Sequence, residues 1–297
     1  MLSLHTNAAA LTSQNAVGSV QKQLSTSMTR LGTGYRINSA MDDAAGLQIA
    51  TRLNSQTRGM AVAMRNTQNG ISMMQTAEGA FNEVSDILLR MKDLATEAAS
   101  DSSSSDDKKS MQSEYDALGE ELANIVKNTS FGGANLFSDG TKVDGTGGKL
   151  SAAMTFQIGA AKSETMSVDV NAALATLAGT KLTGLSTHYS AAAVTTAGTE
   201  ITTTTSANTK IDDISKALDD VGSLRASLGA ASNRLDHVYN NLSNMSTNTT
   251  QARSRIMDVD YASETANMTS KQLLMQASTS MLKQSSSMSQ LVLSLMQ

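Results

Sequence analysis

The chain has 297 residues, a net charge of −4 and no proline, cysteine or tryptophan. Aromatic residues make up only 3% of it, which argues against a sandwich or barrel core, and the lack of cysteine excludes disulfides. The mixed charges offer no basic surface for nucleic acid, no stretch is apolar enough to cross a membrane, and the start lacks the pattern of a cleaved secretory signal. Because proline cannot interrupt them, the helices of this chain are expected to be long.

The first predicted helix runs from Met1 to about Arg30 and ends at Gly32 and Gly34. Its apolar stripe consists of Val17, Leu24 and Leu31. Asp42 and Asp43, the first acidic residues of the chain, come just before the next helix, where carboxylates cap free amides. A metal or acid–base site is the alternative, but no histidine, cysteine or third carboxylate lies near them in the sequence.

The second predicted helix extends over about residues 43–100, which corresponds to roughly 85 Å. Its apolar stripe has heptad spacing and consists of Leu53, Met60, Thr67, Met74, Phe81, Leu88 and Ala95, flanked by Met64, Ile71, Val84 and Met91. A polar turn over residues 100–107 then leads to a shorter antiparallel helix, marked by Met111, Tyr115, Leu118, Leu122 and Ile125.

The middle of the chain changes character after Thr129. A turn is predicted at residues 131–133, and residues 154–158 and 166–170 alternate like the two strands of a β-hairpin. Residues 171–209 are rich in Ala, Thr, Ser and Gly and predict a short surface-exposed insert, with apolar anchors at Leu174, Leu177, Leu182 and Leu185. The candidate sites of O-glycosylation in its threonine-rich run are Thr195, Thr196, Thr202, Thr203 and Thr204, and the alternative is a plain solvated loop.

The C-terminal half predicts another long helix. Its heptad stripe consists of Ile214, Val221, Leu228, Leu235, Leu242, Thr249 and Ile256, with Val238, Met245, Ala252 and Val259 on the neighbouring seam. Beyond Glu264 no acidic residue occurs, and the stripe there consists of Leu274, Met281, Met288, Leu291 and Leu295. The two chain ends are expected to pair with each other or with other subunits.

These patterns predict a mainly α fold, a long antiparallel helical bundle with coiled-coil-like rods from both termini, a small β-hairpin and a short variable middle. The domains are expected to be discontinuous. Residues 1–42 and 257–297 form an inner terminal coiled coil, residues 43–170 and 210–256 a helical rod with the hairpin, and residues 171–209 the insert. Packing rather than chemistry is the expected role of such a chain.

Catalytic and metal sites are not indicated. His5, His188 and His237 are scattered without the spacing of metal ligands, and no nucleophile, oxyanion loop or phosphate-binding glycine run occurs. We therefore predict a protein that is not an enzyme and that uses no metal and no cofactor.

Several short motifs carry more specific information than the apolar spacing. Residues 36–46, RINSAMDDAAG, residues 65–80 and residues 156–159 resemble bacterial flagellin, as do residues 224–234, residues 252–261 and the ending at residues 291–295. The resemblance covers both helical arms and omits only the middle. The opening at residues 2–7 and the run at residues 90–94 look most like the lateral, swarming-type flagellins.

This resemblance implies a subunit that polymerises into the hollow extracellular filament used for swimming or swarming. By analogy, the terminal segments fold on assembly and line the central channel. The absence of acidic groups near the termini would let them pack around one axis without accumulating like charge. The family also implies export without a cleaved signal peptide and contacts with filament cap and hook-associated proteins.

Two further partners follow from the same resemblance. An export chaperone is expected on the C-terminal arm from about Met257 onward, by a helix-in-groove mode. A vertebrate innate immune receptor is expected to recognise Arg90, Leu94 and Glu114 on the exposed face of the rod, although Leu89 replaces a polar residue beside them. Subunit packing is the alternative role for these three residues.

Two alternatives of other kinds remain: a hook-filament junction protein and, less favoured, a coiled-coil signalling protein. The first shares flagellin-like ends, but the resemblance here continues through both helical arms. The second would show a transmembrane span or an uninterrupted heptad without a β-insert, and neither pattern is present.

Overall fold

The structure is a computed structural model that describes the backbone of residues 7–295 and the side chains of residues 7–287. Contacts divide the chain into two compact units. The terminal unit combines residues 1–57 with residues 247–297, and the rod unit comprises residues 58–246. Helices α2 (Ala44–Ala98) and α6 (Thr204–Met257) contribute to both units.

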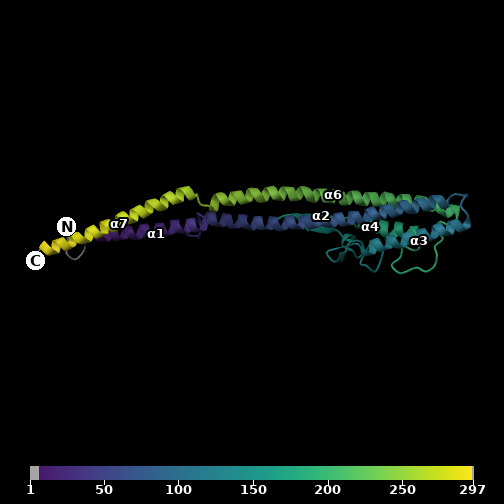
Figure 1. Cartoon of the computed structure of the whole chain (residues 1–297), viewed down its shortest axis with the longest axis horizontal. Coiled ribbons are helices and arrows are strands. Elements are labelled where there is room, and N and C mark those ends of the chain that lie inside the picture. Colours follow the sequence, from purple (N-terminus) through teal and green to yellow (C-terminus); the bar gives the residue numbers. More distant parts are fainter. Residues whose placement is uncertain (1–6, 296–297) are drawn as a thin grey trace. The chain divides into compact units, whose positions relative to one another are not determined.

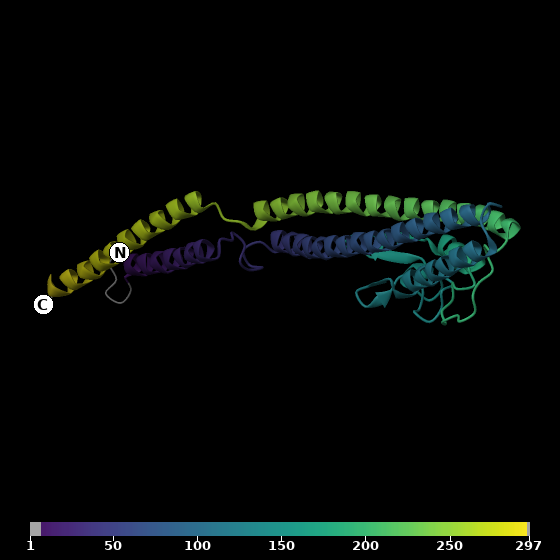
Figure 2. The ribbon, with the colours of Figure 1, turned by 45° about the vertical axis from the view of Figure 1, so that its right-hand side comes forward.

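The terminal unit pairs helix α1 (Ala8–Thr33) with helix α7 (Tyr261–Leu295), and Figures 1 and 2 show the two side by side. The side chain of Asn7 caps α1 by accepting a hydrogen bond from the amide of Ala10 at 3.0 Å. Helix α1 ends at Gly34, which adopts a left-handed φ of 75° and donates its amide to the Arg30 carbonyl. This conformation favours glycine, so the predicted interruption of the first helix is confirmed.

In the rod unit, α2 and α6 run alongside each other and α3 (Ser105–Asn128) packs against them (Figure 1). Ser104 and Asp107 form a capping box at the start of α3, which satisfies two of its free amides. The apolar core lies between these helices, and Phe81 contacts Phe137 with ring centroids 4.5 Å apart. The predicted stripes are confirmed here, because Met60, Thr67, Met74, Phe81, Leu88 and Ala95 of α2 and Ile214, Val221, Leu228, Leu235 and Leu242 of α6 are all buried.

The heptad stripe of α6 loses its burial beyond Leu242. Thr249 and Ile256 are only half-buried, and Met245 on the neighbouring seam is exposed. The helix ends at Met257, so Val259 lies in the short turn before α7 rather than on the same helix as predicted. The apolar spacing of α6 continues to Val259, so the sequence pattern alone does not show that the helix ends at Met257.

Two small antiparallel hairpins complete the rod unit. The turn predicted at residues 131–133 comprises only Gly132 and Gly133, because Phe131 belongs to strand β1 (Ser130–Phe131), which pairs with strand β2 (Ala134–Asn135). Strands β3 (Met154–Gln157) and β4 (Thr165–Val168) pair Met154 with Val168 and Gln157 with Thr165, which confirms the predicted hairpin. A short 3-10 helix, η1 (Lys149–Ser151), precedes β3.

The first part of the insert forms helical turns, which the sequence analysis does not predict. Residues 171–185 form α4 (Asn171–Thr176), the π-helical segment η2 (Leu177–Leu182) and α5 (Thr183–Leu185). Its four leucine anchors are at most 1% exposed and belong to the main core. Burial of these side chains offsets the entropy of ordering a segment with weak helix signals.

Candidate functional site

The inner seam of the terminal helix pair includes several polar contacts. Ser27 is fully buried and accepts a hydrogen bond from Lys271 Nζ at 3.0 Å. Arg30 lies 3.9 Å from the buried carboxylate of Glu264, and the amide side chain of Asn7 donates to the carbonyl of Ser285 at 3.0 Å. These contacts place the start of α1 beside the distal part of α7, so the pair is antiparallel.

Half-buried apolar side chains complete this inner seam. Val17, Leu24 and Leu31 contribute from α1, and Met268, Met275 and Leu282 contribute from α7. Because none of them reaches full burial, the pair on its own gains little of the free energy that apolar burial provides.

A second apolar stripe of α7 faces away from α1, and we call it the outer stripe. It consists of Leu273, Leu274 and Met281, which are 61%, 52% and 66% exposed. Leu11 and Met28 of α1 are exposed to a similar degree. The stripe predicted at Leu274 and Met281 is therefore not the one that pairs with α1, because Met268, Met275 and Leu282 occupy that seam. Met288, Leu291 and Leu295 lie outside the residues whose side chains the structure describes.

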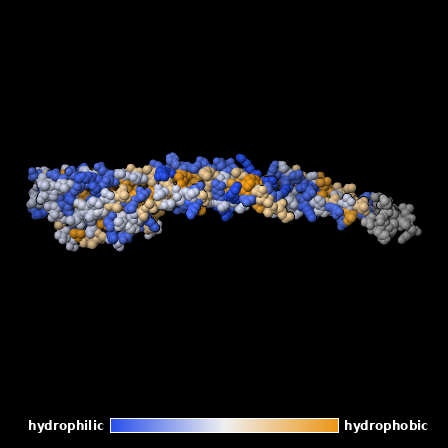
Figure 3. Space-filling view, turned by 180° about the vertical axis from the view of Figure 1, so that it is seen from behind, coloured by the Kyte–Doolittle hydropathy of each residue, from blue (hydrophilic) through white to orange (hydrophobic). Residues whose placement is uncertain are grey.

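On the face that Figure 3 displays, apolar side chains interrupt the hydrophilic surface in small patches rather than in one broad area. Scattered exposed apolar residues are ordinary in soluble proteins, whereas aligned residues on a helix indicate a contact surface. The residues of the outer stripe are aligned on one side of α7, so the stripe has the arrangement that indicates a contact surface.

Two short chain segments are tied together where α1 and α6 end. Tyr35 and Asp258 form an isolated antiparallel bridge, and the Arg36 amide donates to the Met257 carbonyl at 2.6 Å. The Arg36 guanidinium donates to the Ile256 carbonyl at 2.9 Å. Nearby Ile37 is 1% exposed, so this junction holds one of the few fully buried apolar side chains in the described part of the terminal unit.

Asp43 caps the start of α2, as predicted, whereas Asp42 closes the turn that precedes the helix. Asp43 Oδ1 accepts the amide of Gly46 at 2.8 Å, and Asp42 Oδ2 accepts the amides of Asn38 and Ser39. The hydrogen bond from the Ser39 amide, followed by that from Asn38, holds the pKa of Asp42 below its ordinary value. Among the described residues, no three histidine, cysteine or acidic side chains cluster in a way that could hold a metal ion.

The three residues expected to contact an immune receptor have different surroundings. Arg90 and Glu114 are both exposed and form an ion pair with a nitrogen–oxygen distance of 2.6 Å. Leu94 is 2% exposed and belongs to the rod core, so its expected place on the exposed face is wrong. Leu94 shares the buried face of α2 with Met91, Ala95 and Ala98, whereas Arg90 lies at the edge of that face. Leu89, which is 50% exposed, supplies the apolar surface next to Arg90 instead.

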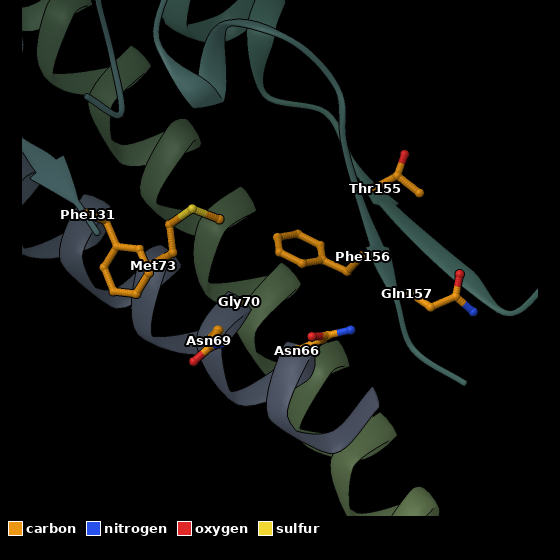
Figure 4. Close-up of a pocket in the computed structure, with 8 residues that line it drawn as sticks. All are labelled: Asn66, Asn69, Gly70, Met73, Phe131, Thr155, Phe156 and Gln157. Carbon is orange, nitrogen blue, oxygen red and sulfur yellow. The ribbon is translucent and has the colours of Figure 1, made fainter. Parts of the chain in front are cut away.

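The described residues also include a hollow of about 360 Å³ beside the larger hairpin, drawn in Figure 4. In that view Phe156 points toward the helices, whereas Thr155 and Gln157 point away from them. A Cβ atom at Gly70 of α2 would lie 3.0 Å from the Phe156 ring and 3.2 Å from Leu235. Glycine at this position therefore lets the hairpin approach the helix closely.

The candidate glycosylation sites also separate by exposure. Thr195, Thr196 and Thr203 are exposed, whereas Thr202 and Thr204 are half-buried. The Thr204 hydroxyl donates to Asp101 and accepts from Lys108, and the Thr202 hydroxyl donates to the Thr199 carbonyl. Thr195, Thr196 and Thr203 are thus the accessible members of the five, and the Thr203 hydroxyl is hydrogen-bonded with the Ser206 hydroxyl at 2.8 Å.

The described helices include none long and apolar enough to span a membrane. Comparison with known proteins accounts for both helical arms. The bacterial flagellin N-terminal helical region matches residues 4–142, and the bacterial flagellin C-terminal helical region matches residues 211–296. The chain belongs to the bacterial flagellin family.

Individual relatives agree with this family. The chain is 35% identical to flagellin B of Vibrio cholerae and 33% identical to polar flagellin A of Vibrio parahaemolyticus, with 99% of each protein covered in both cases. The first alignment spans 374 positions, so that relative carries residues that this 297-residue flagellin lacks. Since polar flagellins are among these relatives, the resemblance to lateral flagellins stays a prediction.

A structural neighbour supports the fold alone. A protein described as a flagellar hook-associated protein from Vibrio parahaemolyticus superposes on this flagellin with a TM-score of 0.55 and 16% sequence identity. The superposition covers 73% of this flagellin and 100% of the neighbour. This likeness does not favour the junction-protein alternative, because the full-length relatives above are flagellins. As a flagellin, the chain is a structural subunit of the bacterial flagellar filament, and the family implies its role in motility.

Proposed function

We propose that the terminal helix pair drives filament assembly through two faces with different tasks. The inner seam pairs α7 with α1 within one subunit, and the outer stripe packs against neighbouring subunits. The exposure of Leu273, Leu274 and Met281 carries this proposal, because contact with another subunit would remove that apolar surface from water. The absence of acidic residues after Glu264 favours close packing of many copies.

Seeded growth of filaments tests this division. We expect the double variant Leu274→Gln/Met281→Gln to keep its helix, because glutamine is about as good a helix former as the residues it replaces. Elongation from filament fragments, followed by electron microscopy, should fall at least about tenfold, since each lost apolar contact weakens every subunit interface. The matched control Lys283→Gln changes an exposed polar position of the same helix that lies away from Leu274 and Met281, and it should elongate normally. Normal elongation of the double variant would refute the proposal.

The arrangement proposed for the filament follows the predicted domains. Residues 1–42 and 257–297 line the channel, residues 43–170 and 210–256 form the surrounding wall, and residues 171–209 face outward. The burial difference between the two units supports this order, because the weakly buried termini need neighbours on all sides. Proteolysis of intact filaments should then cleave within residues 190–197 before it cleaves within α1 or α7.

We also propose that an export chaperone uses the outer stripe before assembly. A helix that presents Leu274 and Met281 on one face matches the helix-in-groove mode. Titration calorimetry of the monomeric chain with its chaperone should show at least about a tenfold loss of affinity for Leu274→Gln/Met281→Gln and none for Lys283→Gln. Equal affinities would assign the stripe to the filament alone. Export without cleavage predicts that filament subunits retain the N-terminus encoded by the gene.

Recognition by an innate immune receptor is proposed to involve Arg90 and Glu114, with Leu89 beside them. Both charged residues are exposed and preorganised by their mutual ion pair. Leu94 is buried in the rod core beneath these residues, so its proposed contribution is to hold the folded helix and not to contact the receptor. A receptor reporter assay should therefore respond to Arg90→Ala, whereas loss of response in Leu94→Ala should track loss of folded protein. Cap and hook-associated proteins are proposed to contact the ends of the filament through the same surfaces that join subunits.

Glycosylation is proposed for Thr195 and Thr196, whose exposure makes them accessible to a transferase. Intact-mass measurement of filaments from the native host, followed by Thr195→Ala/Thr196→Ala, would show whether the added mass disappears. Residual modification after this change would point to Thr203.

A further inference from the structure

A buried histidine fastens part of the insert to α3. His188 is 7% exposed, and its ring lies against Asp116 and Glu120 of α3. Its Nδ1 is 3.0 Å from Glu120 Oε1, and its Nε2 is 3.0 Å from the carbonyl oxygen of Thr196 and 3.5 Å from Asp116 Oδ2. The ring thus bridges α3 and the chain segment that follows His188 itself.

Every partner of this ring is a hydrogen-bond acceptor when the carboxylates are ionised. A neutral imidazole has a single N–H, so one of its nitrogens would face an acceptor with a lone pair. The imidazolium ion has two N–H groups and can donate to Glu120 and to the Thr196 carbonyl at once. The geometry therefore selects the charged ring.

Electrostatics agree with this geometry. Burial opposes the charged ring, but the hydrogen bonds to Glu120 and Thr196 and the charges of Asp116 and Glu120 together raise the pKa of His188 above its ordinary value. A raised pKa in the docked state means that the stabilisation is complete below the ordinary pKa and is lost as the pH rises through the docked-state pKa.

The other anchors of the insert do not depend on this ring. Gln112 donates to Asp116 and to Glu200 at 2.7 Å each, and its own carbonyl accepts the amide of Ile201 at 2.8 Å. On the other side, the Tyr189 hydroxyl donates to the Val143 carbonyl at 2.6 Å. These contacts hold the two ends of residues 190–199, whereas His188 holds the middle through Thr196.

Two further contacts reach residues 190–199 from α3. The Gly198 amide donates to Asp116 Oδ2 at 2.9 Å, and Lys127 Nζ donates to the Ala191 carbonyl at 3.4 Å. Lys127 is the cation of α3 that contacts this segment, and its bond goes to the backbone rather than to the ring. Neither of these two contacts replaces the second N–H of His188 on deprotonation.

We propose that protonated His188 is a pH-dependent latch that holds residues 190–199 against α3, and that this segment detaches as the pH rises and the ring loses its second N–H. The rest of the insert stays docked through Gln112 and the buried leucines. This behaviour goes beyond filament assembly, because it concerns the local order of a segment that the flagellin family regions do not match.

Hydrogen exchange of the full chain, measured by mass spectrometry from about pH 5.5 to about pH 8.5, tests the latch. After correction for intrinsic exchange, the opening equilibrium of residues 190–199 should rise by up to about tenfold per pH unit between the ordinary pKa of histidine and the docked-state pKa, and it should level off above the docked-state pKa. His188→Gln should exchange rapidly in this segment at every pH, with unchanged protection of α3. The control His237→Gln alters an exposed histidine of α6 and should behave like the parent chain.

A second variant keeps the test informative if His188→Gln disturbs folding. Glu120 is 53% exposed at its side chain, so Glu120→Gln should fold normally, keep an acceptor for Nδ1 and remove one charge. It should shift the opening transition toward lower pH by up to about one unit. Opening of residues 190–199 that is independent of pH in the parent chain, or a transition unchanged in Glu120→Gln, would overturn the proposal.

Discussion

The terminal unit and the rod unit use similar apolar spacing but bury it to very different degrees. In the rod unit, most members of the two stripes are at most 2% exposed, and aromatic residues such as Phe81 and Tyr115 fill the space between helices. In the described part of the terminal unit, Ile37 and Ala50 are the buried apolar residues, and the seam between α1 and α7 buries Ser27 and Glu264 instead. Periodicity therefore predicts that a helix pairs, but burial decides whether the pair is stable by itself.

The largest expected loss of stability comes from truncating a buried side chain in the rod core. Phe81→Ala removes a ring that is 1% exposed and should lower the free energy of unfolding by about 3–5 kcal/mol, because it loses burial and leaves a cavity. Leu274→Ala removes a side chain that is 52% exposed and should cost less than about 1 kcal/mol in the monomer. Urea titration of both variants measures the contrast. Similar costs would mean that the terminal pair has a core of its own.

A smaller effect is expected at the end of α1. Gly34→Ala places a side chain on a left-handed residue, 2.9 Å from the Tyr261 hydroxyl, and should destabilise the terminal pair by about 1–2 kcal/mol. Gly32→Ala is the matched control, since its Cβ meets nothing within 4 Å and should stabilise α1 by about 0.5–1 kcal/mol. Amide exchange over residues 8–33 in assembled filaments distinguishes the two. Effects of the same sign would contradict the role given to Gly34.

The polar seam can be altered in the opposite direction. Ser27→Ala/Lys271→Leu replaces a buried hydroxyl and its lysine donor by apolar groups and should strengthen the α1–α7 pair by about 1 kcal/mol. The readout is the helix content of the monomer by circular dichroism, compared with Lys283→Leu at an exposed position of α7. Weaker pairing in the double variant would show that the polar seam stabilises the pair rather than keeping it marginal.

The smallest effect is expected at the surface of the rod unit. Arg90→Ala breaks an ion pair whose side chains are 53% and 46% exposed, and it should change the free energy of unfolding by less than about 1 kcal/mol. Leu94→Ala, one turn further along α2, should cost about 2–5 kcal/mol because Leu94 is buried. Thermal unfolding of the two variants measures this difference. A large loss in Arg90→Ala would assign that residue a structural role.

Much of the rod unit follows from sequence because its signals are local and redundant. The heptads of α2 and α6, the capping box at Ser104 and the turn at residues 132–133 each act over a few residues. Because the chain contains no proline, it lacks the residue that breaks helices most strongly. The end of α6 was harder to predict, since Val259 keeps the apolar spacing through the turn that follows Met257.

By itself, the sequence determined the helical class, the order of the elements, the larger hairpin and the family. Only the tertiary structure decided which stripe of α7 faces α1, because the seam with Met275 and the stripe with Leu274 are one residue apart and have similar hydropathy. It also decided that Leu94 is buried in the core of the rod unit and that residues 171–185 pack as helical turns. In each case a partner distant in sequence supplies the contact, and no local pattern encodes where that partner will lie.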